Sequence, residues 1–251
     1  MNILLIGSGW KSISLVDVYG SVTFTLWLCG CNLRCPFCHN WRLADRSREV
    51  CGPLDIGKLM GELEASKGFI DYLHVTGGEP LVQYKGLVEL FKTAKSKGVP
   101  VSLNSNLTIY KPLKLLLEDS LVDHVATDLK APFTELTGVP EGSASTLFRL
   151  YESSLKLIAE KNIALELRVP VARKLTVEVI RDVVKALHEV IDKLTDKTVV
   201  IVNPLLTKPL VDPRNPDWCS RFCMPEEDEL REIAEVFREL GFKTVVKEVP
   251  R

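Results

Sequence analysis

The sequence lacks any apolar run long enough to span a membrane, and its hydrophobic stretches are interrupted well short of that length. Its first six residues lack the basic start and the cleavage site of a secretion signal. An excess of either charge is also lacking, because 32 basic and 33 acidic residues leave a net charge of −1, which argues against sequence-blind nucleic-acid binding. We therefore expect a cytoplasmic protein with no membrane partner, for which nucleic acid is a disfavoured partner.

The composition that remains is typical of a globular protein. Hydrophobic residues make up 46% and charged residues 26% of the 251 residues, and a chain of this length can bury a sizeable core. The chain has seven cysteines. In a cytosolic protein this number indicates metal or redox chemistry more than a disulfide scaffold.

Three cysteines fall within eight residues, as Cys31, Cys35 and Cys38, directly after the apolar segment 22–28. Thiolates at this density hold a soft metal ion or an iron–sulfur cluster. A four-iron cluster normally takes four cysteines, so three leave one iron open to another ligand, as a catalytic site requires. Structural zinc is the alternative, but zinc sites tend to use paired Cys-x2-Cys elements, and no second pair follows. His39 cannot easily complete a shell because it adjoins Cys38. The pattern favours a 4Fe–4S cluster.

From this loop onward, predicted strands and helices alternate. Repeated strand–helix units imply parallel strands joined by right-handed crossovers, and the binding site of such a fold lies at the carboxyl ends of the strands. We predict an α/β fold, a partial parallel (β/α)6 barrel over residues 1–202, with residues 203–251 as a C-terminal extension on the same domain. The predicted strands are 3–6, 22–28, 71–75, 99–103, 122–126, 164–169, 199–202 and 243–248. The predicted helices are 55–67, 87–94, 112–118, 147–161, 177–194 and 225–240, with a turn at 7–9 and loops at 131–145 and 203–224.

Polar residues gather where the predicted strands end. Gly77 and Gly78 let the backbone approach a ligand closely, and Glu79 offers an acceptor for a cationic amine. Asn104 and Ser105 suit a carboxylate or a ribose, although an ordinary helix N-cap explains them equally well.

Charged residues end or interrupt two later strands. Asp128 and Lys130 share one strand face, where they bind a zwitterion or merely pair with each other. Glu166 and Arg168 share a face inside an apolar strand, and charges in such a place need partners. Together these strand ends fit an amino-acid sulfonium nucleoside that chelates the open iron through its amino and carboxylate groups.

At these residues the sequence resembles the radical S-adenosylmethionine (SAM) superfamily, whose motif is Cys-x3-Cys-x-aromatic-Cys, with Phe37 as the aromatic residue here. The segment 76–80 matches its Gly-Gly-Glu element. Segments 10–17, 30–40 and 128–132 are similar to activating enzymes of glycyl-radical enzymes, above all those of anaerobic ribonucleoside-triphosphate reductase, and Thr137-Gly138 and Glu166-Leu-Arg168 extend the likeness. The sequence departs from the family at Tyr19-Gly20, where Pro-Gly is common, and at Asn106-Leu107, where Asn-Gly is common.

The resemblance implies an enzyme with two cofactors, a 4Fe–4S cluster on the three motif cysteines and SAM. It implies a glycyl-radical enzyme, such as anaerobic ribonucleotide reductase, as partner, and flavodoxin or ferredoxin as electron donor. A radical enzyme acting on RNA or a small molecule, and a non-catalytic zinc-binding module, are the alternatives. The residues that would bind SAM are Gly77, Gly78 and Glu79 at the amino group, Phe37 near the adenine, Asp128, Lys130 and Arg168 at the methionine end, and Asn104 and Ser105 at hydroxyl or carboxylate groups.

Four cysteines lie outside the motif, at Cys29, Cys51, Cys219 and Cys223. A second metal centre formed by the last three is one interpretation. A disulfide between Cys219 and Cys223, or a pair of buried thiols there, ranks above it.

Overall fold

The computed structural model describes residues 3–194 and 197–249, which form two units. The first unit is Met1–Asn32 with Arg42–Ala126, and the second is Leu33–Trp41 with Thr127–Arg251. The two units are described separately below. Within the described residues, no helix is both long enough and apolar enough to cross a membrane.

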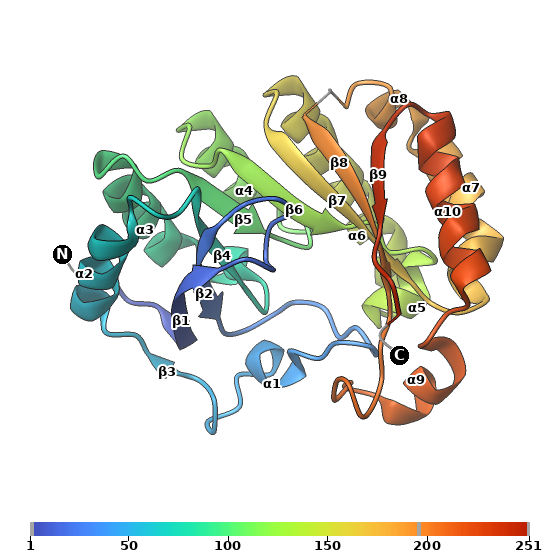
Figure 1. The fold of residues 1–251 in the computed structure, drawn as a ribbon, viewed down its shortest axis with the longest axis horizontal. Helices are drawn as coiled ribbons and strands as arrows, with labels where there is room; N and C mark the ends of the chain where they lie inside the picture. Colours follow the sequence, from blue (N-terminus) through green and yellow to red (C-terminus); the bar gives the residue numbers. More distant parts are fainter. Residues whose placement is uncertain (1–2, 195–196, 250–251) are drawn as a thin grey trace. The chain divides into compact units, whose positions relative to one another are not determined.

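The first unit holds a sheet with the strand order β3-β1-β2-β4-β5-β6 (Figure 1). Strands β2, β4, β5 and β6 pair parallel with one another in that order, whereas β1 pairs antiparallel with both β2 and β3. The strands are β1 (Ile6–Ser14), β2 (Thr23–Leu28), β3 (Gly52–Pro53), β4 (Tyr72–Gly77), β5 (Val101–Asn104) and β6 (His124–Asp128). The helices are α1 (Trp41–Ala44), α2 (Ile56–Ser66), the 3-10 turn η1 (Pro80–Gln83), α3 (Tyr84–Ser96) and α4 (Tyr110–Glu118).

The two faces of this sheet differ in chemistry. Along one register line, the buried apolar side chains belong to Leu26, Val75, Leu103 and Val125. One residue back, the side chains point to the opposite face and are polar, although they too are buried. We call these residues the polar row: Thr25, His74, Ser102 and His124. The Ser102 hydroxyl lies 2.8 Å from Nδ1 of each histidine, and the Thr25 hydroxyl donates to Asp17 at 2.8 Å, so each side chain of the row has a hydrogen-bond partner.

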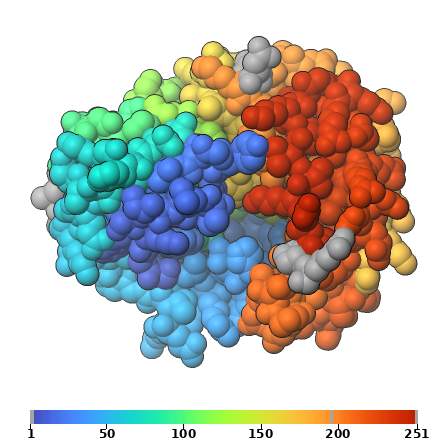
Figure 2. Space-filling model, viewed as in Figure 1, coloured from blue at the N-terminus to red at the C-terminus, as the bar shows by residue number. Residues whose placement is uncertain are grey.

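The second unit contains the last residues of β6, and β7, β8 and β9 follow in the strand order. Strand β8 pairs parallel with both β7 and β9. Helix α10 packs on β8, β9 and α7, as its position beside β9 in Figure 1 shows, and in the space-filling view it forms part of this unit's surface (Figure 2, red). The strands are β7 (Ala164–Val171), β8 (Thr198–Pro204) and β9 (Lys243–Val246). The helices are α5 (Phe133–Thr137), α6 (Glu141–Glu160), α7 (Leu175–Ala186), α8 (His188–Ile191), α9 (Pro216–Phe222) and α10 (Glu227–Glu239).

The prediction for the N-terminal segment is wrong. Instead of a strand at 3–6 and a turn at 7–9, the chain forms the nine-residue strand β1, antiparallel to β2. The glycines lie inside this strand, where the register shifts between Gly7 and Gly9. A Cβ on Gly7 would lie 2.4 Å from the carbonyl oxygen of Trp27, so the glycine serves close strand pairing. Strand β1 therefore adds an antiparallel strand beside the parallel strands that begin with β2.

Three further predictions need correction. The predicted loop 131–145 contains α5 and the first turn of α6, which begins directly after Pro140. The predicted helix 177–194 is two helices, α7 and α8, separated at Leu187. The predicted loop 203–224 contains α9, which has Asn215 at its N-cap and Pro216 at its first position, a common helix start.

Candidate cofactor site

Among the described residues, three cysteines remain thiols, and they are those of the motif. Cys31, Cys35 and Cys38 take no part in disulfides. Cys219 and Cys223 form a disulfide, one of the two interpretations favoured from the sequence. Cys51 pairs with Cys29, so the interpretation of Cys51 as part of a second metal centre is wrong.

The Gly-Gly-Glu element packs against the start of the cysteine loop, within the first unit. The Gly78 amide donates to the Leu28 carbonyl at 2.9 Å, and the Glu79 amide donates to the Gly30 carbonyl at 2.7 Å. A Cβ on Gly77 would lie 2.3 Å from Leu28 O, and one on Gly78 would lie 2.2 Å from Gly30 O. The two glycines are thus required by the adjoining protein backbone, whether or not a ligand also approaches them.

The carboxylate of Glu79 is buried and makes several hydrogen bonds. Its Oε1 accepts from the Leu81 amide and the Ser105 hydroxyl, each at 3.0 Å, and its Oε2 accepts from the Asn106 amide at 2.6 Å. These three hydrogen bonds fix the orientation of the carboxylate. The predicted residues Glu79 and Ser105 are therefore in direct contact, and Ser105 also orients the acceptor.

The other predicted residue of this strand end makes a different contact. The Asn104 amide group donates to the Thr76 hydroxyl at 2.8 Å, which links the ends of β5 and β4. The residue that approaches a motif cysteine is Asn106, whose Nδ2 lies 3.9 Å from Sγ of Cys31 and donates to Oδ1 of Asn32 at 2.9 Å. Asn106 was not among the predicted binding residues. The sequence feature that could have identified Asn106 is its position in the same Asn-Ser-Asn segment as Asn104 and Ser105.

The second unit holds the remainder of the cysteine loop. The Arg34 amide donates to the carbonyl of Thr137 at 3.0 Å, at the end of α5. Gly138 has φ +65, and a Cβ there would lie 2.3 Å from Arg34 O. The Thr137-Gly138 pair noted in the sequence is thus a support for this loop. Farther along the loop, the Cys38 amide donates to the Cys35 carbonyl at 3.2 Å.

The charges predicted on β6 and β7 pair with one another in this unit. Lys130 Nζ lies 2.9 Å from Asp128, and Arg168 Nε lies 2.6 Å from Glu166, whose side chain is only 3% exposed. Burial opposes ionisation of Asp128, but the nearby cations of Lys130 and Arg168 outweigh that cost and hold the pKa of its carboxyl below the usual range. Asp128, Lys130 and Arg168 therefore form one electrostatic group.

The same charges act on the cysteine loop. Burial raises the pKa of the Cys35 thiol to about 11, although the cations of Lys130 and Arg214 favour the thiolate. Burial also lowers the pKa of His39, against the opposing effect of Asp128.

Phe37 packs against a buried apolar cluster of this unit that includes Leu136 and Ala172.

The fit of the residues to a metal cluster rests on their chemistry. Within residues 3–194 and 197–249, no group of three or more His, Cys, Asp or Glu side chains is already placed to hold a metal ion. The donor set nevertheless suits an iron–sulfur cluster, because three neighbouring thiols are kept out of the disulfides that the other four form. The predicted residues fall into two groups, one in each unit. The first comprises Cys31, Gly77, Gly78, Glu79, Asn104 and Ser105, and the second comprises Cys35, Phe37, Cys38, Asp128, Lys130 and Arg168.

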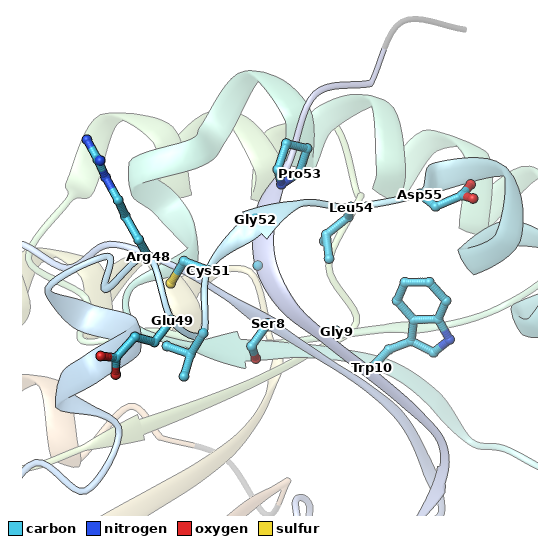
Figure 3. Close-up of a pocket in the computed structure, with 12 residues that line it drawn as sticks. Ser8, Gly9, Trp10, Arg48, Glu49, Cys51, Gly52, Pro53, Leu54 and Asp55 are labelled. Carbon is cyan, nitrogen blue, oxygen red and sulfur yellow. The ribbon is translucent and has the colours of Figure 1, made fainter.

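A separate hollow of about 360 Å³ opens in the first unit beside β1 and β3 (Figure 3). Its lining comes from residues 7–10 and 48–55, which include Trp10, Arg48 and Cys51. None of the predicted binding residues lines it, so it is distinct from both groups.

Comparison with known proteins supports the interpretation of the motif. Residues 26–205 match the profile of a family described as the radical SAM superfamily. A Methanocaldococcus jannaschii protein with the provisional name glycyl-radical enzyme activating enzyme is 24% identical over 246 residues, covering 96% of this chain and 95% of that protein.

Two other relatives align over shorter regions. A 7-carboxy-7-deazaguanine synthase of Methanopyrus kandleri is 33% identical over 41% of this chain and 47% of its own length. A pyruvate formate-lyase-activating enzyme of Staphylococcus aureus is 34% identical over 38% of this chain and 39% of its own length. The chain thus spans less than half of either enzyme.

Among solved structures, native anSMEcpe with bound AdoMet has a TM-score of 0.52 at 15% identity, covering 84% of this chain and 57% of that one. At this identity the likeness concerns the fold alone. Together with the parallel strands of both units, it confirms the predicted α/β fold of the partial-barrel type.

Proposed function

Because this chain belongs to the radical SAM superfamily, we propose that it binds a 4Fe–4S cluster at Cys31, Cys35 and Cys38, cleaves SAM reductively and installs a glycyl radical on a partner protein. The observation that carries the proposal is the set of three motif thiols kept out of disulfides inside the matched region. The similarity to a glycyl-radical enzyme activating enzyme along nearly the whole chain supports the reaction class.

The two cofactors supply the difficult chemistry. When bound, the cluster and SAM would supply reductive cleavage of the C5′–S bond of SAM and hydrogen-atom abstraction from a glycine. The electron comes from a low-potential donor such as flavodoxin or ferredoxin. The protein's own residues hold and orient the reactants and exclude water.

The first unit's group supplies the amino-group end of the proposed SAM site. Glu79 offers negative charge to the SAM amine, and the hydrogen bonds from Ser105 and Asn106 fix the orientation of that carboxylate. Gly77 and Gly78 hold the element against the cysteine loop. Asn104, at the end of β5, is the proposed donor to a SAM carboxylate or ribose hydroxyl.

The second unit's group contains the charged residues that are proposed to bind SAM. Lys130 would bind the SAM carboxylate, and its ion pair with Asp128 sets the position of its ammonium group. Arg168 adds a second cation, held by Glu166. Phe37 offers an aromatic face to the adenine.

The proposed partner is a glycyl-radical enzyme, with anaerobic ribonucleotide reductase as the specific candidate and the cytoplasm as the place of action. The test combines the reduced, reconstituted protein with SAM and candidate reductase in the absence of oxygen, followed by electron paramagnetic resonance. The proposal predicts a glycyl doublet that requires SAM and is absent with Cys35→Ala. SAM cleavage without a doublet on any candidate glycyl-radical protein would contradict it.

A small-molecule substrate is the second candidate, and the partial similarity to a 7-carboxy-7-deazaguanine synthase favours it. The two candidates differ in what accumulates. A protein substrate yields a stable radical on the partner, whereas a small-molecule substrate yields a modified compound detectable by mass spectrometry, with no radical on added protein. Incubation with a deazapurine precursor in place of the reductase distinguishes them.

A further inference from the structure

The segment before α10 has no role in the proposed chemistry, yet it contacts the cysteine loop. We call residues 214–223 the clamp segment; it comprises Arg214, Asn215, helix α9 and Cys223. It lies in the second unit, together with residues 33–41 of the cysteine loop. The sequence predicts a loop over residues 203–224, which include this segment, and leaves its function open.

Backbone hydrogen bonds join the clamp segment to the loop. The Arg214 amide donates to the Cys38 carbonyl at 3.0 Å, and the Asn215 amide donates to the Pro36 carbonyl at 2.9 Å. These two bonds fix the backbone on both sides of Phe37 and directly at a motif cysteine.

Side chains extend the contact. The Trp218 and Phe37 rings have centroids 6.2 Å apart and are tilted by 41°, a favourable arrangement for two aromatic rings. Trp218 also packs on Phe222, with centroids 5.1 Å apart. Both tryptophan contacts adjoin a buried cluster that contains Cys219 and Cys223. The aromatic residue of the motif is therefore held by α9.

The clamp segment is itself fixed at both ends. Asn215 accepts a hydrogen bond from the Trp218 amide at 3.0 Å, which caps the start of α9. At its end, the Arg173 amide donates to the Phe222 carbonyl at 2.7 Å, and the Arg173 side chain donates to the Arg221 carbonyl at 2.8 Å. The Cys219–Cys223 disulfide closes the last turn. A segment fixed in this way can orient a loop that contacts it.

We propose that the clamp segment positions the Pro36–Cys38 part of the cysteine loop for cluster binding, with Asn215 and Trp218 as positioning residues. The inference rests on the proposed function only in naming the cluster as the group that the loop holds.

The test compares two disruptive variants with two matched controls. Trp218→Ala removes the ring contact and Asn215→Ala removes the helix cap, whereas Trp218→Phe keeps an aromatic ring against Phe37. Asp55→Ala removes the N-cap of α2, whose side chain accepts from the Lys58 amide at 2.9 Å in the first unit. It therefore controls for the loss of a cap away from the clamp segment.

The first measurement is the rate of iron release from the reconstituted holoprotein to a chelator. Mutation of a residue that supports a metal ligand typically lowers metal affinity about 10-fold or more. We therefore expect Trp218→Ala and Asn215→Ala to release iron faster by about that factor. We expect Trp218→Phe and Asp55→Ala to match the wild type. Wild-type release rates in both disruptive variants, or equal acceleration in Asp55→Ala, would overturn the proposal.

The second measurement uses the metal-free protein and therefore does not depend on the proposed function. Hydrogen–deuterium exchange reports the opening of the amides that join the two segments. We expect faster exchange in peptides covering residues 33–41 and 212–217 for the disruptive variants alone. Unchanged exchange in these peptides of the disruptive variants would overturn the proposal. If the wild type takes up no iron but the disruptive variants show the faster exchange, the proposed function is overturned and the positioning contact stays in place.

Discussion

The backbone amide of Glu79 donates to the carbonyl oxygen of Gly30 at 2.7 Å, directly before the first motif cysteine. This bond makes the Gly-Gly-Glu element and the start of the cysteine loop one local structure, although about fifty residues separate them in the chain. The contact leaves no space for a side chain on Gly78, where a Cβ would lie 2.2 Å from the same oxygen of Gly30.

The first prediction follows from that clash. Gly78→Ala should destabilise the protein by about 1–3 kcal/mol, because the added methyl group must displace backbone. It should also reduce iron uptake, since the displaced residues adjoin Cys31. Gly61→Ala is the matched control, because a Cβ at this α2 position meets nothing within 4 Å and alanine favours a helix. Urea denaturation gives the free energy of unfolding of both variants, and equal values for the two would contradict the steric argument.

The second prediction concerns the ion pair of β7. Glu166 and Arg168 are 3% and 17% exposed, so removing one partner leaves a charge in a largely dry environment. Arg168→Met should lower the free energy of unfolding by about 3–5 kcal/mol. The double variant Glu166→Met, Arg168→Met should recover much of that loss, because it removes the buried charge as well. Denaturation of both variants and of Glu166→Met completes a double-mutant cycle, and additive losses would refute the coupling.

The Glu166–Arg168 pair shows what sequence periodicity can establish. Alternation places both side chains on one strand face, and charges in an apolar strand need partners, but only the structure shows that each is the partner of the other. The strand β1 did not follow, because Gly7 and Gly9 are also typical of turns and only the pairing with β2 decides between the two. Helix α9 was missed although Asn215-Pro216 is a helix-start signal, because seven residues give too short an apolar period to recognise.

For the candidate site, the sequence yields predictions of individual residues. The motif spacing predicts the three thiols as ligands, and the strand ends predict Glu79 and Lys130 as binding residues. The contacts that support them come from distant segments, such as Asn106 at Cys31 and Trp218 at Phe37. The Cys29–Cys51 disulfide likewise depends on β3 returning beside β1. Local sequence patterns do not predict these long-range contacts.

The third prediction concerns acid stability. The pKa of Asp128 is lower in the folded protein than its ordinary value of about 3.9, chiefly because Lys130 and Arg168 overcome the effect of burial. The stabilising contribution is therefore complete above about pH 5 and is lost as the pH falls through the folded-state pKa. Urea denaturation from pH 7 down to about pH 3 should show the advantage of the wild type over Asp128→Asn shrinking with acidity. If the difference in free energy of unfolding between the wild type and Asp128→Asn is constant over this pH range, the lowered pKa of Asp128 is contradicted.

The central claim, that the three motif thiols carry radical SAM chemistry, is tested most directly by measuring 5′-deoxyadenosine. The anaerobically reconstituted protein is incubated with SAM and dithionite, and the products are separated by chromatography. We predict that the wild type forms 5′-deoxyadenosine and methionine in equal amounts and that the triple variant of Cys31, Cys35 and Cys38 to Ala forms none. The control variant Cys29→Ser, Cys51→Ser keeps all three motif thiols and should retain the activity. Formation of 5′-deoxyadenosine by the triple variant at the wild-type rate would contradict the account.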